Sequence, residues 1–164
     1  MPGTYSQILL HIVFSTKQRE PWISPETAER LYPYMGGIVR AEQGVLLAVG
    51  GIEDHVHLYL RWRPDAALSD LMRTVKSRSS KWVHETFPAL GAFAWQEGYA
   101  AFSVSKSQEP NVKRYIANQR EHHAKDGRRV EAFKSSETRI DDRQLEIFHG
   151  IPVRMTLAAP ATPG

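Results

Sequence analysis

The sequence contains no cysteine among its 164 residues, which excludes disulfide bonds and metal sites with thiolate ligands. It also lacks a long apolar run. The most apolar segment, VLLAVGGI, is far shorter than the roughly 20 residues that a membrane-spanning helix requires. The N-terminal MPGTYSQ has no basic segment followed by an apolar one, so no signal peptide is predicted and a cytoplasmic location is expected.

Charge of one sign is not in large excess either. Lys and Arg total 21 against 18 Asp and Glu, which gives a net charge of +3. This balance permits a polyanionic partner but does not by itself indicate one. With 41% hydrophobic and 24% charged residues, the composition fits one compact domain, which we assign to residues 1–150. The Pro- and Ala-rich tail, 151–164, has no hydrophobic period and is predicted to be disordered.

The hydrophobic pattern alternates between strand-like and helix-like segments. It predicts strands over 5–17, 45–50, 52–60 and 93–105, and helices over 25–39, 65–87 and 109–125. The β-α-β-β-α-β order predicts an α+β, ferredoxin-like fold, in which two helices cover one face of a four-stranded antiparallel sheet. The last helix is an addition, and we expect the second sheet face either to lie open or to be covered by it.

Several local signals refine these elements. Ser24 is expected to cap the first helix, with Pro25 at its first position. Gly36-Gly37 is expected to end or kink that helix, and Gly50-Gly51 to form the turn of a hairpin. Gly98 interrupts the fourth predicted strand, which indicates a bulge or a close approach.

The segment DHVHLYL (54–60) places two histidines on one face of a predicted strand. Side chains two apart in a strand project together, so His55 and His57 share a face with Tyr59. The apolar residues between them can enter a core. Two imidazoles on one rigid strand are a good start for a divalent-metal site. From His-x-His alone, a pair of surface or hydrogen-bonded histidines is the favoured interpretation, and His11 is expected to be structural.

The last predicted helix carries further polar candidates. Tyr115 and Gln119 are four residues apart and would share one helical face, with His122 and His123 close by. Gln119 could supply an oxygen ligand to a metal, and the Tyr115 hydroxyl could act as a covalent nucleophile toward a phosphodiester. Taken singly, a half-buried tyrosine and a solvated glutamine are the favoured interpretations.

Together, these motifs closely resemble a specific family. His55-Val56-His57, WQEGY (95–99) with SVS (103–105), and YIANQREHH (115–123) stand in the order found in the single-tyrosine HUH transposases of bacterial insertion sequences, the TnpA-like enzymes. The resemblance implies that His55, His57 and Gln119 bind Mg²⁺ or Mn²⁺, with Asp54 supporting them. It also implies that Tyr115 is the nucleophile.

The resemblance implies a reaction and a substrate as well. Tyr115 would cleave single-stranded DNA next to hairpins at element ends, hold the 5′ phosphate as a phosphotyrosine, and later rejoin the strand. Two rival hypotheses stay open: a regulatory relative that binds hairpin DNA without cutting it, and a metal-dependent phosphoesterase that uses water.

Basic and aromatic residues are candidates for DNA contact. A charged helix face is usually only solvated, but the resemblance favours phosphate contact. The basic candidates are Arg73, Lys76, Arg78, Lys81, Arg114 and Arg120. Trp22, Trp62 and Trp95 are candidate base-stacking platforms, whereas Trp82 lies on the apolar stripe of its helix and is assigned to the core.

The linker before the last helix, KSQEPN (106–111), bears on assembly. It is short and polar, and it could dock the helix on its own sheet or on that of a neighbour. The resemblance implies a homodimer in which the histidines of one chain and the tyrosine of the other form a site in trans.

Overall fold

The computed structural model of the chain describes residues 3–121. These residues form one four-stranded sheet in the order β2-β3-β1-β4, with every neighbouring pair antiparallel. Three single-turn 3₁₀ segments join the larger elements. In chain order the elements are β1 (Ile8–Ser15), η1 (Lys17–Arg19), α1 (Pro25–Ala41), β2 (Val45–Ile52), β3 (His55–Trp62), α2 (Leu68–Thr86), η2 (Pro88–Leu90), β4 (Ala100–Ser103), η3 (Lys106–Gln108) and α3 (Glu109–Ala117).

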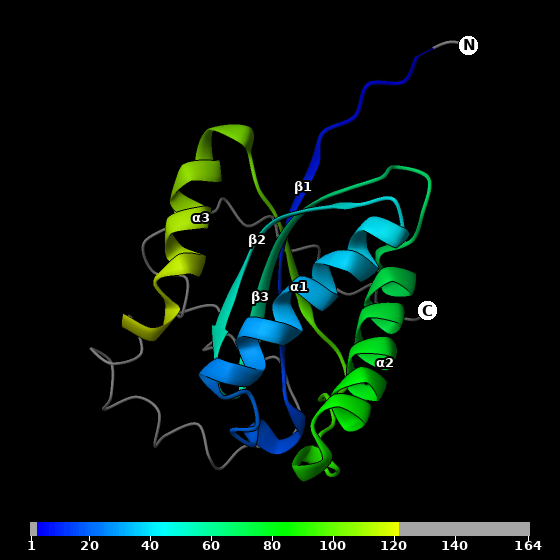
Figure 1. Cartoon of the computed structure of the whole chain (residues 1–164). Coiled ribbons are helices and arrows are strands. Elements are labelled where there is room, and N and C mark those ends of the chain that lie inside the picture. The colour runs from blue at the N-terminus through cyan, green and yellow to red at the C-terminus, as the bar shows by residue number, and fades with distance from the viewer. Residues whose placement is uncertain (1–2, 122–164) are drawn as a thin grey trace, which may run out of the picture.

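The sheet is covered on both faces, and the predicted α+β fold is confirmed (Figure 1). Leu58 and its strand neighbours Val56 and Leu60 pack with Ile12 beneath α1 and α2 in the main core. On the opposite face α3 contributes to a smaller apolar cluster of Leu9, Tyr59, Val112 and Ile116. The last helix therefore covers the second face of the sheet, one of the two arrangements expected. No helix within residues 3–121 has the length and apolarity to cross a membrane.

The start of α1 is as predicted, but its interior is not. The Ser24 hydroxyl accepts a hydrogen bond from the Thr27 backbone N–H at 3.2 Å, and Pro25 is the first helical residue. The prediction that Gly36-Gly37 ends or kinks the helix is wrong, because α1 continues to Ala41. Each glycine costs a helix about 1 kcal/mol. Burial of the apolar side chains on either side of the pair offsets this cost; these are Leu31, Met35, Ile38 and Val39.

The fourth strand is much shorter than predicted, because the chain turns before it. Trp95 makes only an isolated bridge to Thr16, and Gly98 has a φ of +79°, a left-handed conformation that favours glycine. The Lys76 ammonium secures this turn by donating hydrogen bonds to the carbonyl oxygens of Gln96 and Gly98. Residues 93–99 are therefore a clamped loop rather than a strand.

Gly50-Gly51 is not the hairpin turn that the sequence predicts. Both glycines lie within β2, paired with His57 and Val56 of β3, and the turn follows at 53–54. A Cβ atom on Gly50 would lie well inside van der Waals contact of the Ile116 carbonyl oxygen. Gly50 therefore permits the close approach of α3 to the sheet, opposite His57.

We predict that Gly50→Ala weakens the docking of α3. The added methyl group must displace the Ile116 backbone, and overpacking of this kind costs about 1–3 kcal/mol. Urea denaturation should show this loss, and hydrogen exchange should show faster exchange in α3 than in β1 or β3. Gly37→Ala is the matched control, since nothing lies near a Cβ there and alanine in a helix interior adds about 0.5–1 kcal/mol. Wild-type stability and wild-type α3 protection in Gly50→Ala would contradict the role assigned to Gly50.

Candidate functional site

The two histidines of β3 lie side by side on the sheet face that α3 covers. His55 and His57 are only 2% and 1% exposed, and their ring centroids are 5.0 Å apart. The predicted common orientation is thus correct, and surface histidines are excluded. Buried imidazoles require polar partners, because an unsatisfied polar group in an apolar interior is costly.

His55 receives its partner from the adjacent residue. Its Nδ1 atom lies 2.7 Å from Oδ1 of Asp54, whose other oxygen faces Nε of Arg19 at 3.3 Å. Arg19 and Gln18 both have left-handed backbone conformations, with φ near +59° and +55°. Such strain clusters at functional sites. Here it accompanies the placement of a guanidinium against the Asp54 carboxylate.

His57 receives its partner from β1. Its Nδ1 atom lies 2.9 Å from Nε2 of His11, and the two rings stack with centroids 5.2 Å apart. Burial lowers the pKa of His11 to about 4, so this imidazole is neutral near pH 7. The expected structural role of His11 is correct, but its contact with His57 was missed. The alternation of β1, which puts His11 on the histidine face once β1 and β3 are paired, is the signal that could have found it.

Tyr115 lies on α3, the helix that covers this face of the sheet, and its ring lies near those of His57 and His11. Its ring centroid lies 5.7 Å from that of His57 and 6.1 Å from that of His11, and the side chain is half-buried beneath α3. Burial raises the pKa of Tyr115, and hydrogen bonding from the Gln119 side chain partly offsets this rise. The phenol is therefore protonated at neutral pH.

Gln119 lies after a break at Asn118 in the helix that was expected to contain it, and residues 119–121 are helical again. α3 ends at Ala117 and is capped by Asn118, yet the Gln119 amide still donates to the Tyr115 carbonyl oxygen at 3.0 Å. The side chain is 1% exposed, so the solvated alternative is wrong. Its Oε1 atom is buried and has no hydrogen-bond partner within residues 3–121. His122 and His123, also expected nearby, lie outside the described residues.

Two polar contacts hold α3 and the residues after it against the sheet. Tyr59 donates a hydrogen bond to Glu109 at 3.0 Å, and Glu109 also pairs with Lys106 and Lys113. Past the end of α3, the Arg120 guanidinium lies 2.8 Å from the Glu53 carboxylate in the β2–β3 turn. These contacts tie the two ends of the Tyr115 segment to β3 and to the β2–β3 turn.

The chemistry of the buried donors fits a divalent cation. The Nε2 atoms of His55 and His57 and Oε1 of Gln119 are all buried. In the described part of the chain, no group of three or more His, Cys, Asp or Glu residues could hold a metal ion. Within residues 3–121, a third protein ligand beside the two β3 imidazoles would be of another type, and the Gln119 amide oxygen is such a group. Carbonyl oxygens suit Mg²⁺ and Mn²⁺, and imidazole nitrogens suit divalent transition-metal cations.

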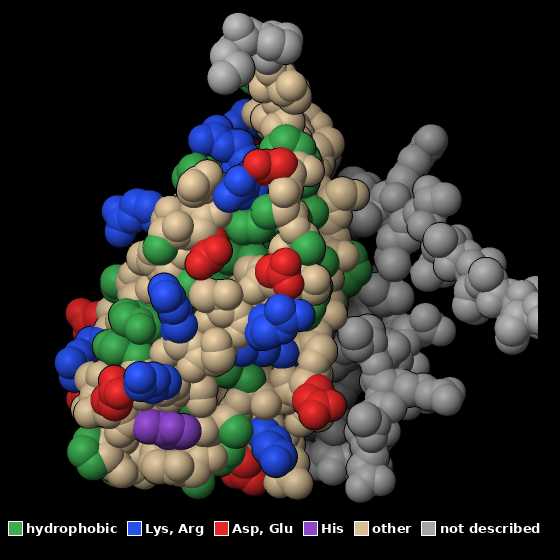
Figure 2. Space-filling view, turned by 90° about the vertical axis from the view of Figure 1, so that its right-hand side faces the viewer, with side chains coloured by type: hydrophobic (Ala, Val, Ile, Leu, Met, Phe, Trp, Pro, Cys, Tyr) green, Lys and Arg blue, Asp and Glu red, His purple; other side chains and the backbone are tan. Residues whose placement is uncertain are grey.

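The candidate DNA-binding residues fall on two different sides of the molecule. α2 packs on the sheet face opposite the histidines, and the face on its side intersperses basic and acidic side chains (Figure 2). There Arg73 pairs with Asp70 at 3.0 Å, while the half-buried Lys76 is bound to the carbonyls of the 93–99 loop. Arg78 and Lys81 are exposed.

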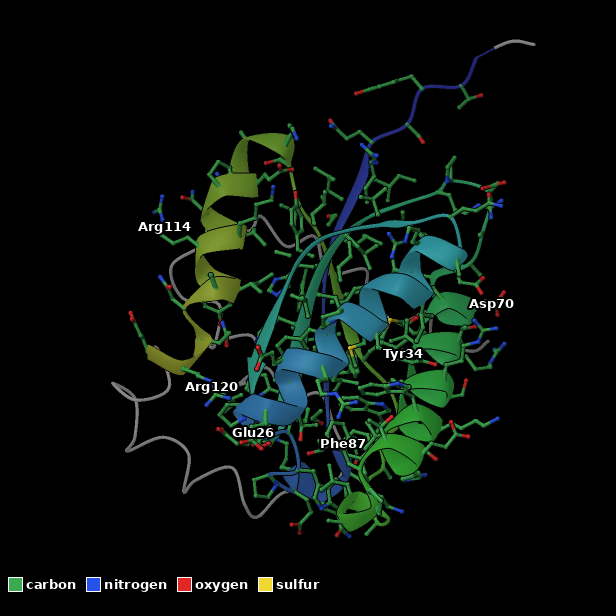
Figure 3. The ribbon with its side chains drawn as sticks, in the orientation of Figure 1. Glu26, Tyr34, Asp70, Phe87, Arg114 and Arg120 are labelled. Atoms are coloured by element: carbon green, nitrogen blue, oxygen red, sulfur yellow. The ribbon has the colours of Figure 1, made fainter. Side chains whose placement is uncertain are left out.

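The other two basic candidates lie on the same side as Tyr115. Arg114 points outward from α3, whereas Arg120 lies toward the end of β2 (Figure 3). The tryptophans proposed as stacking platforms are not free for that role, whereas Trp82 packs against the core as predicted. Trp62 and Trp95 are buried in the main core and cannot stack on bases, and Trp22 and Trp82 pack partly buried against it.

Comparison with known proteins places this chain among transposases. The model of the family described as "Transposase IS200 like" matches residues 4–119. The chain is 25% identical over 122 residues to the ISDra2 transposase TnpA of Deinococcus radiodurans, covering 71% of this chain and 87% of that protein.

Two solved structures share the fold. A crystal structure of a putative transposase from Deinococcus radiodurans superposes with a TM-score of 0.60 at 26% identity, covering 73% of this chain and 95% of that one. A REP-associated tyrosine transposase bound to a REP hairpin superposes with a TM-score of 0.53 at 13% identity, covering 82% and 74%, and this likeness concerns the fold alone.

We predict that Glu109 makes the docking of α3 sensitive to acid. Lys106 first, then Lys113 and the Tyr59 hydroxyl, hold the pKa of Glu109 at about 2, below the ordinary value of 4.5. Because the folded-state pKa is depressed, the stabilisation is present above pH 4.5 and is lost as the pH falls from 4.5 through about 2.

Glu109→Gln should therefore be less stable than wild type at pH 7, and the difference should shrink as the pH falls below 4.5. Urea denaturation of both proteins at pH 7, 4.5 and 3 measures this. Tyr5→Phe is the control, since Tyr5 is 87% exposed. A stability difference that does not change with pH would contradict the ion-pair assignment.

Proposed function

We propose, since this chain belongs to the IS200-like transposase family, that it cleaves and rejoins single-stranded DNA through a covalent bond between Tyr115 and a 5′ phosphate. The observation that carries the proposal is the position of Tyr115, whose ring lies 5.7 Å from that of His57 within a buried polar group. A half-buried tyrosine with no chemical role does not need two buried imidazoles and a buried amide beside it.

The reaction is a transesterification at phosphorus. The Tyr115 oxygen attacks the phosphodiester and loses its proton, the bond from phosphorus to the 3′ oxygen breaks, and that oxygen leaves as a 3′ hydroxyl. Attack by a 3′ hydroxyl on the phosphotyrosine reverses the step and restores the phenol. Each step exchanges one phosphate ester for another, so no ATP is required.

The residues around Tyr115 have different roles in the proposed reaction. Burial raises the pKa of the Tyr115 phenol, so the hydroxyl is protonated at neutral pH, and the Gln119 amide donates a hydrogen bond to the Tyr115 carbonyl oxygen. His55, His57 and Gln119 would hold Mg²⁺ or Mn²⁺. Bound there, such a cation would supply Lewis-acid polarisation of a phosphoryl oxygen.

The proposed substrate is single-stranded DNA with hairpin ends. The REP-associated tyrosine transposase with the same fold is bound to a REP hairpin, and that precedent supports a hairpin partner here. Arg114 and Arg120 lie on the same segment as Tyr115 and are the basic candidates best placed for phosphates near the cleaved bond. A hairpin stem contacting α2 would meet the opposite side of the molecule, where Arg78 and Lys81 are exposed.

Assembly as a homodimer stays a prediction. Within the single chain, α3 docks on its own sheet and Tyr115 lies beside its own His57. Exchange of α3 between two subunits would build the same contacts in trans. Mixed dimers of His55→Ala and Tyr115→Phe chains separate the arrangements, because only exchange leaves one site with both residues intact.

We predict that Tyr115→Phe abolishes covalent attachment to DNA and leaves hairpin binding nearly unchanged, since it removes only the attacking oxygen. A denaturing gel of protein incubated with labelled single-stranded hairpin DNA measures attachment, and a mobility shift measures binding. Tyr34→Phe, on the far side of the sheet, is the matched control and should attach DNA like wild type.

The same gel tests the rival functions. A regulatory hairpin binder would shift DNA without cutting it, and a phosphoesterase using water would cut DNA without becoming attached. Attachment by the Tyr115→Phe variant would show that another residue is the nucleophile.

We predict that His55→Ala and His57→Ala each abolish cleavage and weaken Mn²⁺ binding, because losing one of two imidazoles removes a ligand and the geometry of the site. Gln119→Ala should be milder, since water can replace a neutral oxygen ligand. Calorimetric titration with Mn²⁺ measures this. His84→Ala is the control, because His84 lies on α2, on the other side of the sheet, and its Nε2 atom hydrogen-bonds the Phe93 carbonyl oxygen. Equal Mn²⁺ affinity in wild type and both β3 variants would reduce the histidine pair to a structural feature.

A further inference from the structure

The hydrogen bond between the buried rings of His11 and His57 can form in two ways, with either ring as the donor. Nε2 of His11 and Nδ1 of His57 are 2.9 Å apart, and in a neutral pair only one of these atoms carries the proton between them. The rings come from different strands, 46 residues apart in the chain. Which ring donates decides which nitrogen of His57 keeps its lone pair.

If His57 binds a metal ion through Nε2, His57 must be the donor of this hydrogen bond. An imidazole that binds a cation through Nε2 carries its proton on Nδ1, and this second nitrogen must find an acceptor. At His55 the acceptor is the Asp54 carboxylate, 2.7 Å from Nδ1. At His57 the atom in the same position is Nε2 of His11. The two histidines are therefore oriented by two different acceptors.

We propose that His11 is the positioning residue of His57: it accepts the His57 Nδ1–H at its own Nε2, carries its own proton on Nδ1, and so leaves Nε2 of His57 with the lone pair that a metal ion needs. This inference rests on the proposed function of the β3 histidines. It assigns His11 a role equivalent to that of Asp54 at His55.

The surroundings explain why a neutral acceptor stands at position 11. Asp54 lies at the end of β3 with 18% of its side chain exposed, and Arg19 balances its charge. His11 is 3% exposed in the middle of the sheet, where an aspartate would be a buried charge with a large desolvation cost. A neutral imidazole accepts the same hydrogen bond without that cost.

Packing fixes the His11 ring in the required orientation. His11 is paired with Tyr59 on β3 and with Phe102 on β4, so it reaches His57 diagonally across the β1–β3 pair. The Phe102 ring lies 6.3 Å away on one side and the Tyr115 ring 6.1 Å away on another. Neighbours on three elements therefore restrict the rotation that would turn Nε2 away from His57.

The direct test is the tautomer of each ring in the metal-free wild-type protein. Long-range ¹H–¹⁵N NMR correlations distinguish protonated from unprotonated ring nitrogens. We expect His11, His55 and His57 all to carry the proton on Nδ1 at pH 7.5. A His57 ring protonated on Nε2 would overturn the proposal, and this measurement needs no variant.

Variants extend the test to metal affinity. His11→Phe retains an aromatic ring but has no acceptor, so His57 should shift toward the Nε2-protonated form and Mn²⁺ affinity should fall about 10- to 100-fold. His11→Gln offers an amide oxygen and should recover part of both readouts. His84→Phe, which removes a histidine remote from the site, should change neither.

Wild-type tautomers and wild-type Mn²⁺ affinity in His11→Phe would refute the positioning role. The tautomer measurement is independent of DNA chemistry. A failure of Tyr115 to form a covalent link would therefore refute the proposed function and leave the His11–His57 assignment standing.

Discussion

Burial of β3 on both of its faces is the constraint from which the rest of the structure follows. Val56, Leu58 and Leu60 satisfy one face with apolar packing under α1 and α2, as any amphipathic sheet would. The other face carries His55 and His57, which α3 closes off from water. Polar groups enclosed in this way must be paired within the protein. Asp54 and His11 supply the partners, and this need links the hairpin turn, β1 and β3 in one polar network.

The predictable parts of the fold are those that depend on short-range chemistry. The Ser24-Pro25 start of α1 and the alternation along β3 follow from local rules, and both are correct. The predictions for Gly36-Gly37 and Gly50-Gly51 are wrong. A glycine in a sequence shows that the backbone can adopt many conformations there, but it does not show which neighbouring group requires a glycine. At Gly50 the requirement comes from Ile116, a residue of the last helix. At Gly36-Gly37 it is burial of the flanking side chains that keeps the helix intact, and no window of sequence contains the partners that bury them.

How much of the candidate site could be predicted from the sequence differs from residue to residue. The common orientation of His55 and His57 follows from strand geometry, whereas the grouping of Tyr115 and Gln119 with them came from family resemblance. The His11 contact depends on the β1–β3 register, and Arg19 depends on two successive left-handed residues that no sequence rule for arginine or glutamine indicates. For Trp62 and Trp95 the sequence suggested a role that the structure does not support. Their size and aromaticity suggested base stacking, but both side chains are buried in the core.

The histidines and Tyr115 are held in place by different kinds of structure. The imidazoles of His55 and His57 stand on a central strand of a sheet that is packed on both faces, and each ring is held by a hydrogen bond, to Asp54 and to His11 respectively. Tyr115 stands on a nine-residue helix, too short to be stable alone in water, so its position depends on docking. That docking rests on the close approach at Gly50, the Tyr59–Glu109 bond and the Arg120–Glu53 pair. The two polar contacts lie toward the ends of the segment, and the apolar packing of Val112 and Ile116 against Leu9 and Tyr59 lies between them. The fold thus combines imidazoles held on central strands with a tyrosine whose position depends on the docking of a short helix.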